Sequence, residues 1–121
     1  MHRVAVVEDN PDNRLLVRVL LEQFYRVSDY GDGPAALEGM RRQRPDLVLL
    51  DISLPGMDGT EVLRRIRADD ALRDLPVVAL TAHAMKADRE RFLREGFDGY
   101  VAKPITDESE LLGVIERLLQ A

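Results

Sequence analysis

The residues best suited to chemistry in this chain stand at the ends of short apolar runs. Two runs lead into acidic residues, and two others lead into a hydroxyl and an ammonium group: Glu8 with Asp9, Asp51, Thr81 and Lys103. Carboxylates that lie close together repel each other, so a cluster of them needs a cation. Oxygen ligands without Cys or His fit Mg²⁺ best, with Mn²⁺ and Ca²⁺ as alternatives.

Brought together, these groups would suit phosphoryl transfer to a carboxylate. Asp51 would be the nucleophile. Mg²⁺ and Lys103 would neutralise charge on the transferring group, and the Thr81 hydroxyl would donate a hydrogen bond to one of its oxygens. The prediction depends on whether the fold places the ends of these runs side by side.

The run that ends on Asp51 predicts the centre of the fold. Residues 47–50 are all apolar, which indicates a strand buried on both faces. Residues 52–59 contain one proline and two glycines and predict a loop. Asp51 would then lie at the carboxyl end of a central strand, at the edge of an open α/β sheet where ligands bind.

The rest of the chain alternates between runs that predict strands and segments that predict helices. Further strands are expected at residues 4–7, 26–30, 77–80 and 100–103. Helices are expected after Asn10-Pro11, after Asp32-Gly33-Pro34, over roughly residues 60–68 and 85–95, and after Asp107, which forms a capping-box-like start with Glu110.

Helix-spaced apolar residues predict which face of each helix is buried. The first helix would bury Leu15, Leu16, Val19 and Leu20, the second Ala36, Leu37 and Met40, the third Val62, Leu63 and Ile66, and the last Leu111, Leu112, Ile115, Leu118 and Leu119. Residues 69–76 predict a polar connection. The basic side chains of the fourth helix predict a solvated face: Lys86, Arg89, Arg91 and Arg94.

This alternation predicts an α/β fold with a five-stranded parallel sheet and helices on both of its faces. All carboxyl ends of a parallel sheet lie on one edge. The three carboxylates, the hydroxyl and the ammonium group are therefore expected to converge there.

Length and charge narrow the classes of function. The chain has 121 residues, the size of one domain, and a net charge of −5, which argues against nucleic acid as a direct ligand. It contains no Cys, so no disulfide framework or Cys-based zinc site is expected. Without a run of transmembrane length or a secretory signal, we expect a cytoplasmic protein that does not enter a membrane.

Four motifs, in order and spread over four strand ends, resemble the receiver domains of two-component response regulators, the CheY-like family. They are Val6-Val7-Glu8-Asp9-Asn10, Leu49-Leu50-Asp51-Ile52-Ser53-Leu54-Pro55-Gly56-Met57-Asp58-Gly59, Leu80-Thr81-Ala82 and Lys103-Pro104. The resemblance covers the whole chain and implies one receiver domain over residues 1–121. It also implies a doubly wound, flavodoxin-like fold with strand order 2-1-3-4-5.

The resemblance implies a role for each site residue. Asp51 would accept phosphate from a phosphohistidine, and Lys103 would pair with Asp51 and then with the phosphoryl group. Thr81 and Tyr100 would be the switch residues, with Tyr100 turning inward behind Thr81 when Thr81 moves to the phosphoryl oxygen. The Lys103–Pro104 peptide bond is cis in this family. Mg²⁺ would be held by Asp9 and Asp51, by the backbone carbonyl of Ser53, and by Glu8 mostly through water.

The sequence departs from the family pattern in one segment, and two of its residues stand at positions that vary within the family. Residues 23–27 lack the glycine that commonly ends the first helix and are about one residue shorter than usual, which affects the expected geometry of the second strand. Ser53 and His83 occupy positions that tune dephosphorylation in the family.

The implied partners are proteins. A histidine kinase or a histidine phosphotransfer protein would supply the phosphoryl group, and a downstream protein would respond in trans. The face formed by the fourth helix, the fifth strand and the fifth helix could also form a homodimer. The chain could be a stand-alone regulator or a receiver excised from a hybrid sensor kinase, whose receivers the run at residues 81–86 resembles.

Two other classes remain as alternatives to this non-enzymatic module, which would catalyse only its own phosphorylation and dephosphorylation. A phosphatase of the haloacid dehalogenase type also uses an aspartate nucleophile, but it needs a second acid where this chain has Ser53. A flavin-binding flavodoxin would need a hydroxyl-rich phosphate loop after the first strand, where Glu8 and Asp9 would repel phosphate.

Overall fold

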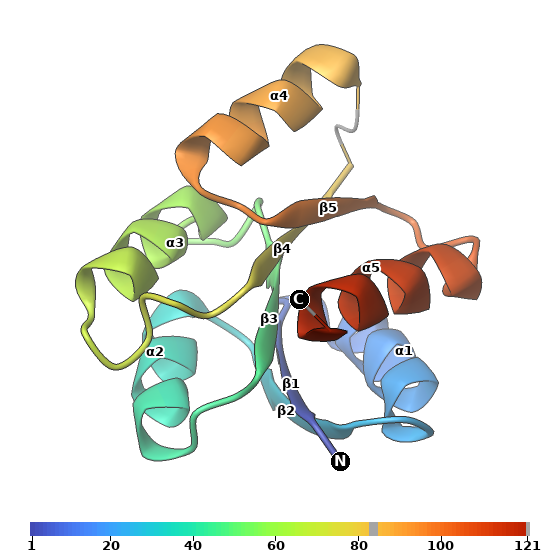
Figure 1. The fold of residues 1–121 in the computed structure, drawn as a ribbon, viewed down its shortest axis with the longest axis horizontal. Coiled ribbons are helices and arrows are strands. Elements are labelled where there is room, and N and C mark those ends of the chain that lie inside the picture. The colour runs from blue at the N-terminus through green and yellow to red at the C-terminus, as the bar shows by residue number, and fades with distance from the viewer. Residues whose placement is uncertain (83–84, 121) are drawn as a thin grey trace.

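The computed structural model describes residues 1–82 and 85–120, which form one sheet flanked by helices (Figure 1). The elements are β1 (Arg3–Val7), α1 (Pro11–Glu22), β2 (Arg26–Tyr30), α2 (Gly33–Arg42), β3 (Leu47–Asp51), α3 (Gly59–Ala68), β4 (Val77–Thr81), α4 (Lys86–Glu95), β5 (Gly99–Ala102) and α5 (Glu108–Gln120). All neighbouring strands are parallel and their order is β2-β1-β3-β4-β5. The predicted doubly wound, flavodoxin-like fold is confirmed.

Strand register brings the predicted chemistry to one edge of the sheet. Val7 lies opposite Leu50 in the paired strands β1 and β3. The next residues along the two chains, Glu8 and Asp51, therefore lie at the same level of the sheet. On the other side of β3, Asp51 lies opposite Leu80. Thr81 in turn lies opposite the residue before Lys103. The central strands β3 and β4 are buried along their whole length, which holds these ends rigidly.

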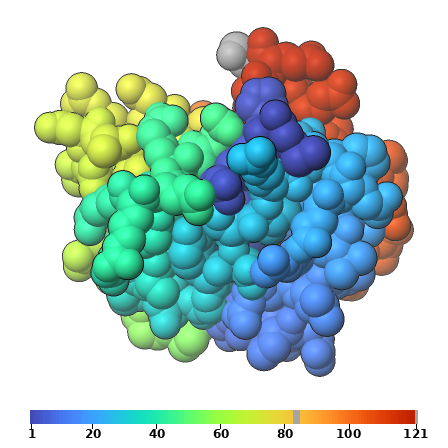
Figure 2. Space-filling model, turned by 90° about the horizontal axis from the view of Figure 1, so that it is seen from below, coloured from blue at the N-terminus to red at the C-terminus, as the bar shows by residue number. Residues whose placement is uncertain are grey.

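Two apolar clusters cover the two faces of the sheet. Helices α2 and α3 lie on one face and α1 and α5 on the other, with α4 beyond β5 (Figure 1). Seen from below, the blue segment that contains α1 and the green segment that contains α2 flank the β2 edge (Figure 2). Within the described ranges, no helix combines the length and apolar character that crossing a bilayer requires.

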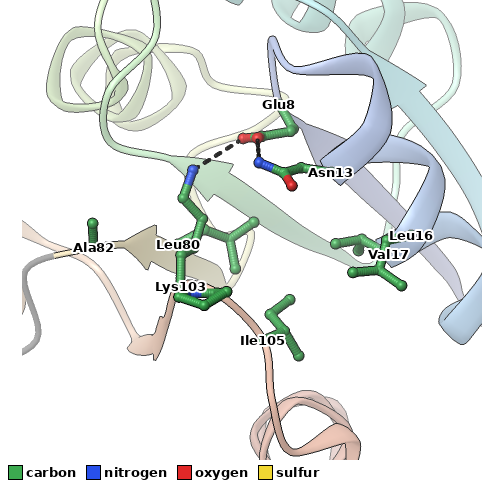
Figure 3. Close-up of a pocket in the computed structure, with 9 residues that line it drawn as sticks. Glu8, Asn13, Leu16, Val17, Leu80, Ala82, Lys103 and Ile105 are labelled. Carbon is green, nitrogen blue, oxygen red and sulfur yellow. Dashed lines mark hydrogen bonds and ion pairs between the residues drawn. The ribbon is translucent and has the colours of Figure 1, made fainter.

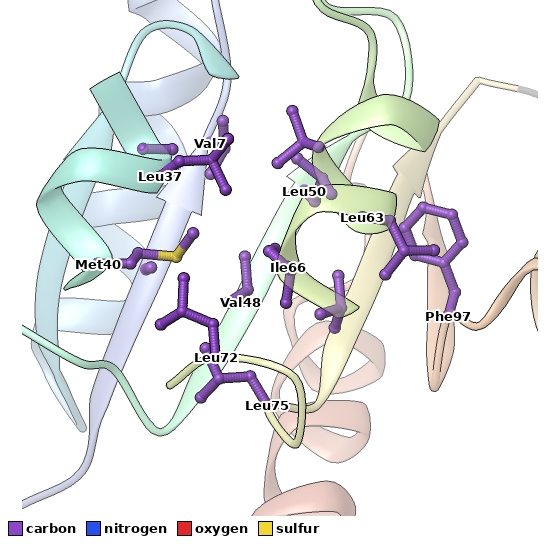
Figure 4. Close-up of a cluster of buried hydrophobic side chains, with 14 of the residues drawn as sticks. Val7, Leu37, Met40, Val48, Leu50, Leu63, Ile66, Leu72, Leu75 and Phe97 are labelled. Carbon is purple, nitrogen blue, oxygen red and sulfur yellow. The ribbon is translucent and has the colours of Figure 1, made fainter. Parts of the chain in front are cut away.

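The connection between α3 and β4 is more than a polar loop. Leu72 and Leu75 from this connection are buried in the apolar cluster between the sheet and helices α2 and α3, called here the α2–α3 cluster (Figure 4). The helices contribute Leu37, Met40, Leu63 and Ile66 to it. The prediction of a polar connection over residues 69–76 is therefore wrong at these two positions. Hydrophobic periodicity predicts buried positions only in helices and strands, because a loop has no fixed repeat. Single buried leucines among polar residues in a loop are therefore not predicted by it.

The predicted buried face of α1 is wrong. Val17 and Leu21 are the residues that α1 buries, whereas Leu15, Leu16 and Val19 are 60%, 47% and 55% exposed. The helix has apolar residues around most of its circumference, so spacing alone permits two faces. The direction in which the chain leaves β1 selects between them, and this leaves an apolar patch of Leu15, Leu16 and Val19 on the surface.

The remaining differences lie at element ends. α3 begins at Gly59, α4 at Lys86 and β5 at Gly99, each one residue away from the expected start. Asp107 caps α5 by accepting from the Ser109 amide at 2.9 Å. Without a glycine, α1 ends as the amides of Phe24 and Tyr25 donate to the carbonyl of Leu21 at 2.9 and 2.8 Å.

Candidate functional site

Asp51 is buried at the carboxyl end of β3 and each of its carboxylate oxygens has a donor. Oδ1 accepts from the Ser53 amide at 2.9 Å, and Oδ2 accepts from Lys103 Nζ at 2.9 Å. The start of α3 packs tightly beneath this strand end. A Cβ added at Gly59 would lie 2.4 Å from the Asp51 carbonyl oxygen, so only glycine permits this approach.

Glu8 lies beside Asp51 and is only 1% exposed. Its Oε1 accepts from the side-chain amide of Asn13 at 3.1 Å, and its Oε2 from Lys103 Nζ at 3.4 Å (Figure 3). Asp9 is exposed at the mouth of the site. Carboxylate oxygens of Glu8, Asp9 and Asp51 all lie within 4.8 Å of one another.

Burial and proximity shift the protonation of this group. Burial, and after it a hydrogen bond with Asp51, together raise the pKa of Glu8 to about 7. Burial also opposes ionisation of Asp51, but bonds from Glu8, Ser53 and Lys103 outweigh it and lower the pKa of Asp51. Burial disfavours the Lys103 ammonium, yet Asp51 and Glu8 outweigh this and raise the pKa of Lys103. The arrangement favours an ionised Asp51 paired with a charged lysine.

Thr81 and Lys103 meet where β4 and β5 end. Thr81 is buried, and its carbonyl accepts from the Lys103 amide at 2.8 Å. The Lys103–Pro104 peptide bond is cis. The ammonium group of Lys103 reaches across to Asp51 and Glu8. This places the hydroxyl-bearing residue and the lysine on the same side of Asp51.

Tyr100 is half-buried against the α2–α3 cluster and contacts α4. Its hydroxyl accepts from Arg89 Nη1 at 2.9 Å, and the Arg89 guanidinium carbon lies 5.4 Å from the centre of its ring. The prediction that Arg89 belongs to a purely solvated face is therefore wrong. No sequence signal joins these two residues, because they lie on different elements.

The structure brings Glu8, Asp9, Asp51 and Lys103 together. Ser53, in the exposed loop after β3, joins them through its backbone amide, which donates to Asp51. His83, named above as a tuning position, lies outside the described residues. The contact of Asn13 with Glu8 is a second one that sequence reasoning missed. A signal for it existed, since Asn13 stands in the first turn of the helix that follows Glu8 and Asp9.

A cavity of about 280 Å³ adjoins the site on the α1 side. Its rim carries Glu8, Asn13 and Lys103, and its walls are apolar, formed by Leu16, Val17, Leu80, Ala82, Pro104 and Ile105 (Figure 3). The cavity therefore connects the polar site to the exposed apolar patch of α1 through Leu16.

The residues fit a hard divalent cation. Three carboxylates converge, all donors are oxygen, and Asp9 is open to solvent. Lys103 supplies one positive charge against three carboxylates. A cluster of this composition suits Mg²⁺, which prefers carboxylate oxygens and keeps part of its water shell.

Comparison with known proteins identifies the family of this chain. Residues 4–116 match the family described as the response regulator receiver domain. The chain belongs to this family. It is 45% identical to the polar-differentiation response regulator DivK of Brucella anthropi over 104 residues, which cover 85% of both chains. It is also 45% identical to the sensor protein GacS of Pseudomonas syringae pv. syringae over 109 residues.

The chain spans 12% of the length of GacS, so the likeness concerns one part of that kinase. Among solved structures, the receiver domain of the sensor histidine kinase PA1611 from Pseudomonas aeruginosa PAO1 superposes with a TM-score of 0.89 at 38% identity. The superposition covers 99% of this chain and 98% of that one. That structure has a magnesium ion coordinated in the active site cleft. Receiver domains of this family are signalling modules of two-component systems and are generally not enzymes.

Proposed function

We propose that residues 1–121 act as one receiver domain in which Asp51 accepts a phosphoryl group from a phosphohistidine with Mg²⁺ bound. The observation that carries this proposal is the pairing of a buried Asp51 with Lys103 beside two further carboxylates. Specific donors hold this buried carboxylate in one orientation at the strand end, where it is not surrounded by water. It can therefore act as a nucleophile.

Asp9, Asp51 and the Ser53 carbonyl would hold the ion, with Glu8 acting mostly through water. When bound, the ion neutralises negative charge on the phosphoryl oxygens. A carboxylate oxygen of Asp51 attacks phosphorus, the bond from phosphorus to the donor imidazole nitrogen breaks, and the electron pair stays on that nitrogen. Lys103 then pairs with the phosphoryl group, and the Thr81 hydroxyl donates to one of its oxygens.

The response would follow from differential contacts of Thr81 and Tyr100 in the two states. If Thr81 moves toward the phosphoryl group, Tyr100 can fill the space behind it and change the face formed by α4, β5 and α5. That face would bind a downstream protein in trans or a second copy of this chain. No nucleic acid or membrane enters this scheme, and the only reactions catalysed are the domain's own phosphorylation and dephosphorylation.

We assign the phosphodonor side to α1. The patch of Leu15, Leu16 and Val19 is exposed and apolar, and Leu16 also lines the cavity that adjoins Glu8 and Lys103. A histidine kinase or a histidine phosphotransfer protein could cover this patch while its histidine reaches Asp51. The exchange would take place in the cytoplasm, with the domain either free or part of a hybrid sensor kinase.

Acetyl phosphate tests the site without a protein partner. With Mg²⁺, intact-mass analysis should show one added phosphoryl group on the wild-type chain and none on Asp51→Asn. Asp58→Asn serves as the matched control, because Asp58 caps α3 nearby and has no place in the site. Equal labelling of Asp51→Asn and the wild type would exclude Asp51 as the acceptor.

A substitution in the α1 patch tests the phosphodonor side separately. Leu15→Asp should slow transfer from a phosphohistidine protein and leave the acetyl phosphate reaction unchanged.

A further inference from the structure

Glu8 is a buried carboxylate whose orientation depends on two donors. The first is Lys103, whose Nζ is 3.4 Å from Glu8 Oε2 but only 2.9 Å from Asp51 Oδ2. The second is the neutral amide of Asn13, 3.1 Å from Glu8 Oε1 (Figure 3). Lys103 is therefore committed mainly to Asp51, and Asn13 is the donor that Glu8 does not share with the phosphoacceptor.

The start of α1 explains why Asn13 reaches Glu8. The side chain of Asn10 accepts from the amides of Asp12 and Asn13 at 2.9 and 3.1 Å, which fixes the first turn of the helix. The side chain of Asn13, five residues after Glu8, then lies back toward the end of β1. Asn13 is itself exposed, so this contact belongs to the site and not to the core.

A neutral donor on one oxygen of Glu8 has a specific consequence for a cation. It holds the carboxylate plane and leaves the other oxygen, Oε2, on the side of Lys103 and Asp51. A carboxylate oxygen of Glu8 lies within 4.8 Å of those of Asp9 and Asp51. Being uncharged, it adds no positive charge that would compete with a divalent ion. Outer-shell donors of this kind tune metal affinity in many sites, typically by 10- to 100-fold.

We propose that Asn13 is a positioning residue for the divalent cation, acting through the carboxylate of Glu8. This inference rests on the proposed function, because it requires that the acidic cluster binds Mg²⁺. It assigns Asn13 no contact with the ion or the phosphoryl group. Its role is to keep Glu8 oriented before the ion arrives and after Lys103 has moved to the phosphoryl group.

A double-mutant cycle tests the proposal by isothermal titration with Mg²⁺ alone. Asn13→Ala should weaken binding by about 10-fold. In the Glu8→Ala background the same substitution should change the affinity by less than about 2-fold, because the side-chain oxygens through which Asn13 acts are gone. A change of affinity within about 2-fold for Asn13→Ala alone, or an equal loss in both backgrounds, would overturn the proposal.

A second readout separates positioning from a structural role at the start of α1. With acetyl phosphate, Asn13→Ala should raise the Mg²⁺ concentration for half-maximal phosphorylation about 10-fold, with little change in the rate at saturating Mg²⁺. A lower rate at saturating Mg²⁺ with no change in half-saturation would contradict the inference. If the wild type itself binds no Mg²⁺, the proposed function fails; if it binds and Asn13→Ala matches it, only the role of Asn13 fails.

Discussion

Helices α1 and α4 both begin at the edge of the sheet that carries the site, but they are held in different ways. α1 is capped by Asn10 and buries Val17 and Leu21. α4 begins at Lys86, after the N-cap residue Met85, which is 76% exposed, and among the described residues no side chain caps its first turn. Phe92 is the residue that α4 buries. The donor side of the site is therefore more firmly fixed than the side proposed to respond.

The two ends of α4 differ as much as the two helices do. At the carboxyl end, Gly96 takes a left-handed conformation, with φ of 112°, and its carbonyl accepts from Arg67 at 2.8 Å. Phe92 packs edge-on against Phe97 with ring centres 5.9 Å apart. Toward the amino end, the contact between Arg89 and Tyr100 connects the helix to β5. This asymmetry suits a helix that pivots about its carboxyl end.

The largest expected effect concerns the single buried anchor of α4. Phe92→Ala should lower the free energy of unfolding by about 3–5 kcal/mol, because it removes a fully buried aromatic side chain and leaves a cavity. Leu93→Ala, at the exposed neighbouring position, should change it by less than about 0.5 kcal/mol. Urea unfolding of both variants measures the difference. Similar losses for both would show that α4 is not held through Phe92.

The corresponding test on α1 concerns its two apolar faces. Leu21→Ala should cost about 2–5 kcal/mol, because Leu21 is fully buried. Val19→Ala should stay within about 0.5 kcal/mol, because Val19 is exposed. The same urea experiment distinguishes them. A large loss of unfolding free energy for Val19→Ala would mean that α1 buries the face predicted from sequence. The patch assigned to the phosphodonor would then not be exposed.

These helices also show how far sequence reasoning carries. The parallel sheet and the convergence of Glu8, Asp51 and Lys103 follow from where apolar runs end, because a parallel sheet puts those ends on one edge. The strand order follows instead from the resemblance to receiver domains. The orientation of α1 does not follow, since two apolar faces satisfy the same helical spacing. The pairing of Arg89 with Tyr100 does not follow either, because it depends on how α4 packs against β5.

A smaller effect should appear on the α1 side when pH changes in the metal-free protein. Burial raises the pKa of Glu8 from 4.5 to about 7, so the folded state binds a proton that the unfolded state has lost. The stability from this group is complete below pH 4.5 and is lost as pH rises through 7. Thermal melts in EDTA should show a decrease on the order of 1–3 kcal/mol between pH 5 and pH 8.

Glu8→Gln should remove most of this decrease, which assigns it to Glu8 and not to the two histidines of the chain. In NMR spectra, the side-chain amide of Asn13 should follow the titration because it donates to Glu8. The backbone amide of Leu93 in α4 should not. An equal response in α1 and α4 would mean that the two sides of the site are not independent.

The smallest effect on stability, and the most informative about the pivot, belongs to Arg89. Arg89→Ala should lower the free energy of unfolding by no more than about 1 kcal/mol, because the contact is only partly buried. Its effect should be local. Hydrogen exchange of the Arg89 and Glu90 amides should become faster. Exchange of the Leu93 amide should stay unchanged, because the neighbouring Phe92 side chain is buried and holds this part of the helix.

Two further variants decide whether the Arg89 contact itself is responsible. Tyr100→Phe keeps the ring under the guanidinium and removes the hydroxyl acceptor, so it should reproduce part of the change in exchange. Arg94→Ala removes an exposed arginine from the same helix and should leave exchange in both halves as in the wild type. If Arg89→Ala accelerates exchange evenly along α4, the helix moves as a rigid unit. Its amino-terminal half would then not be the element that Tyr100 controls.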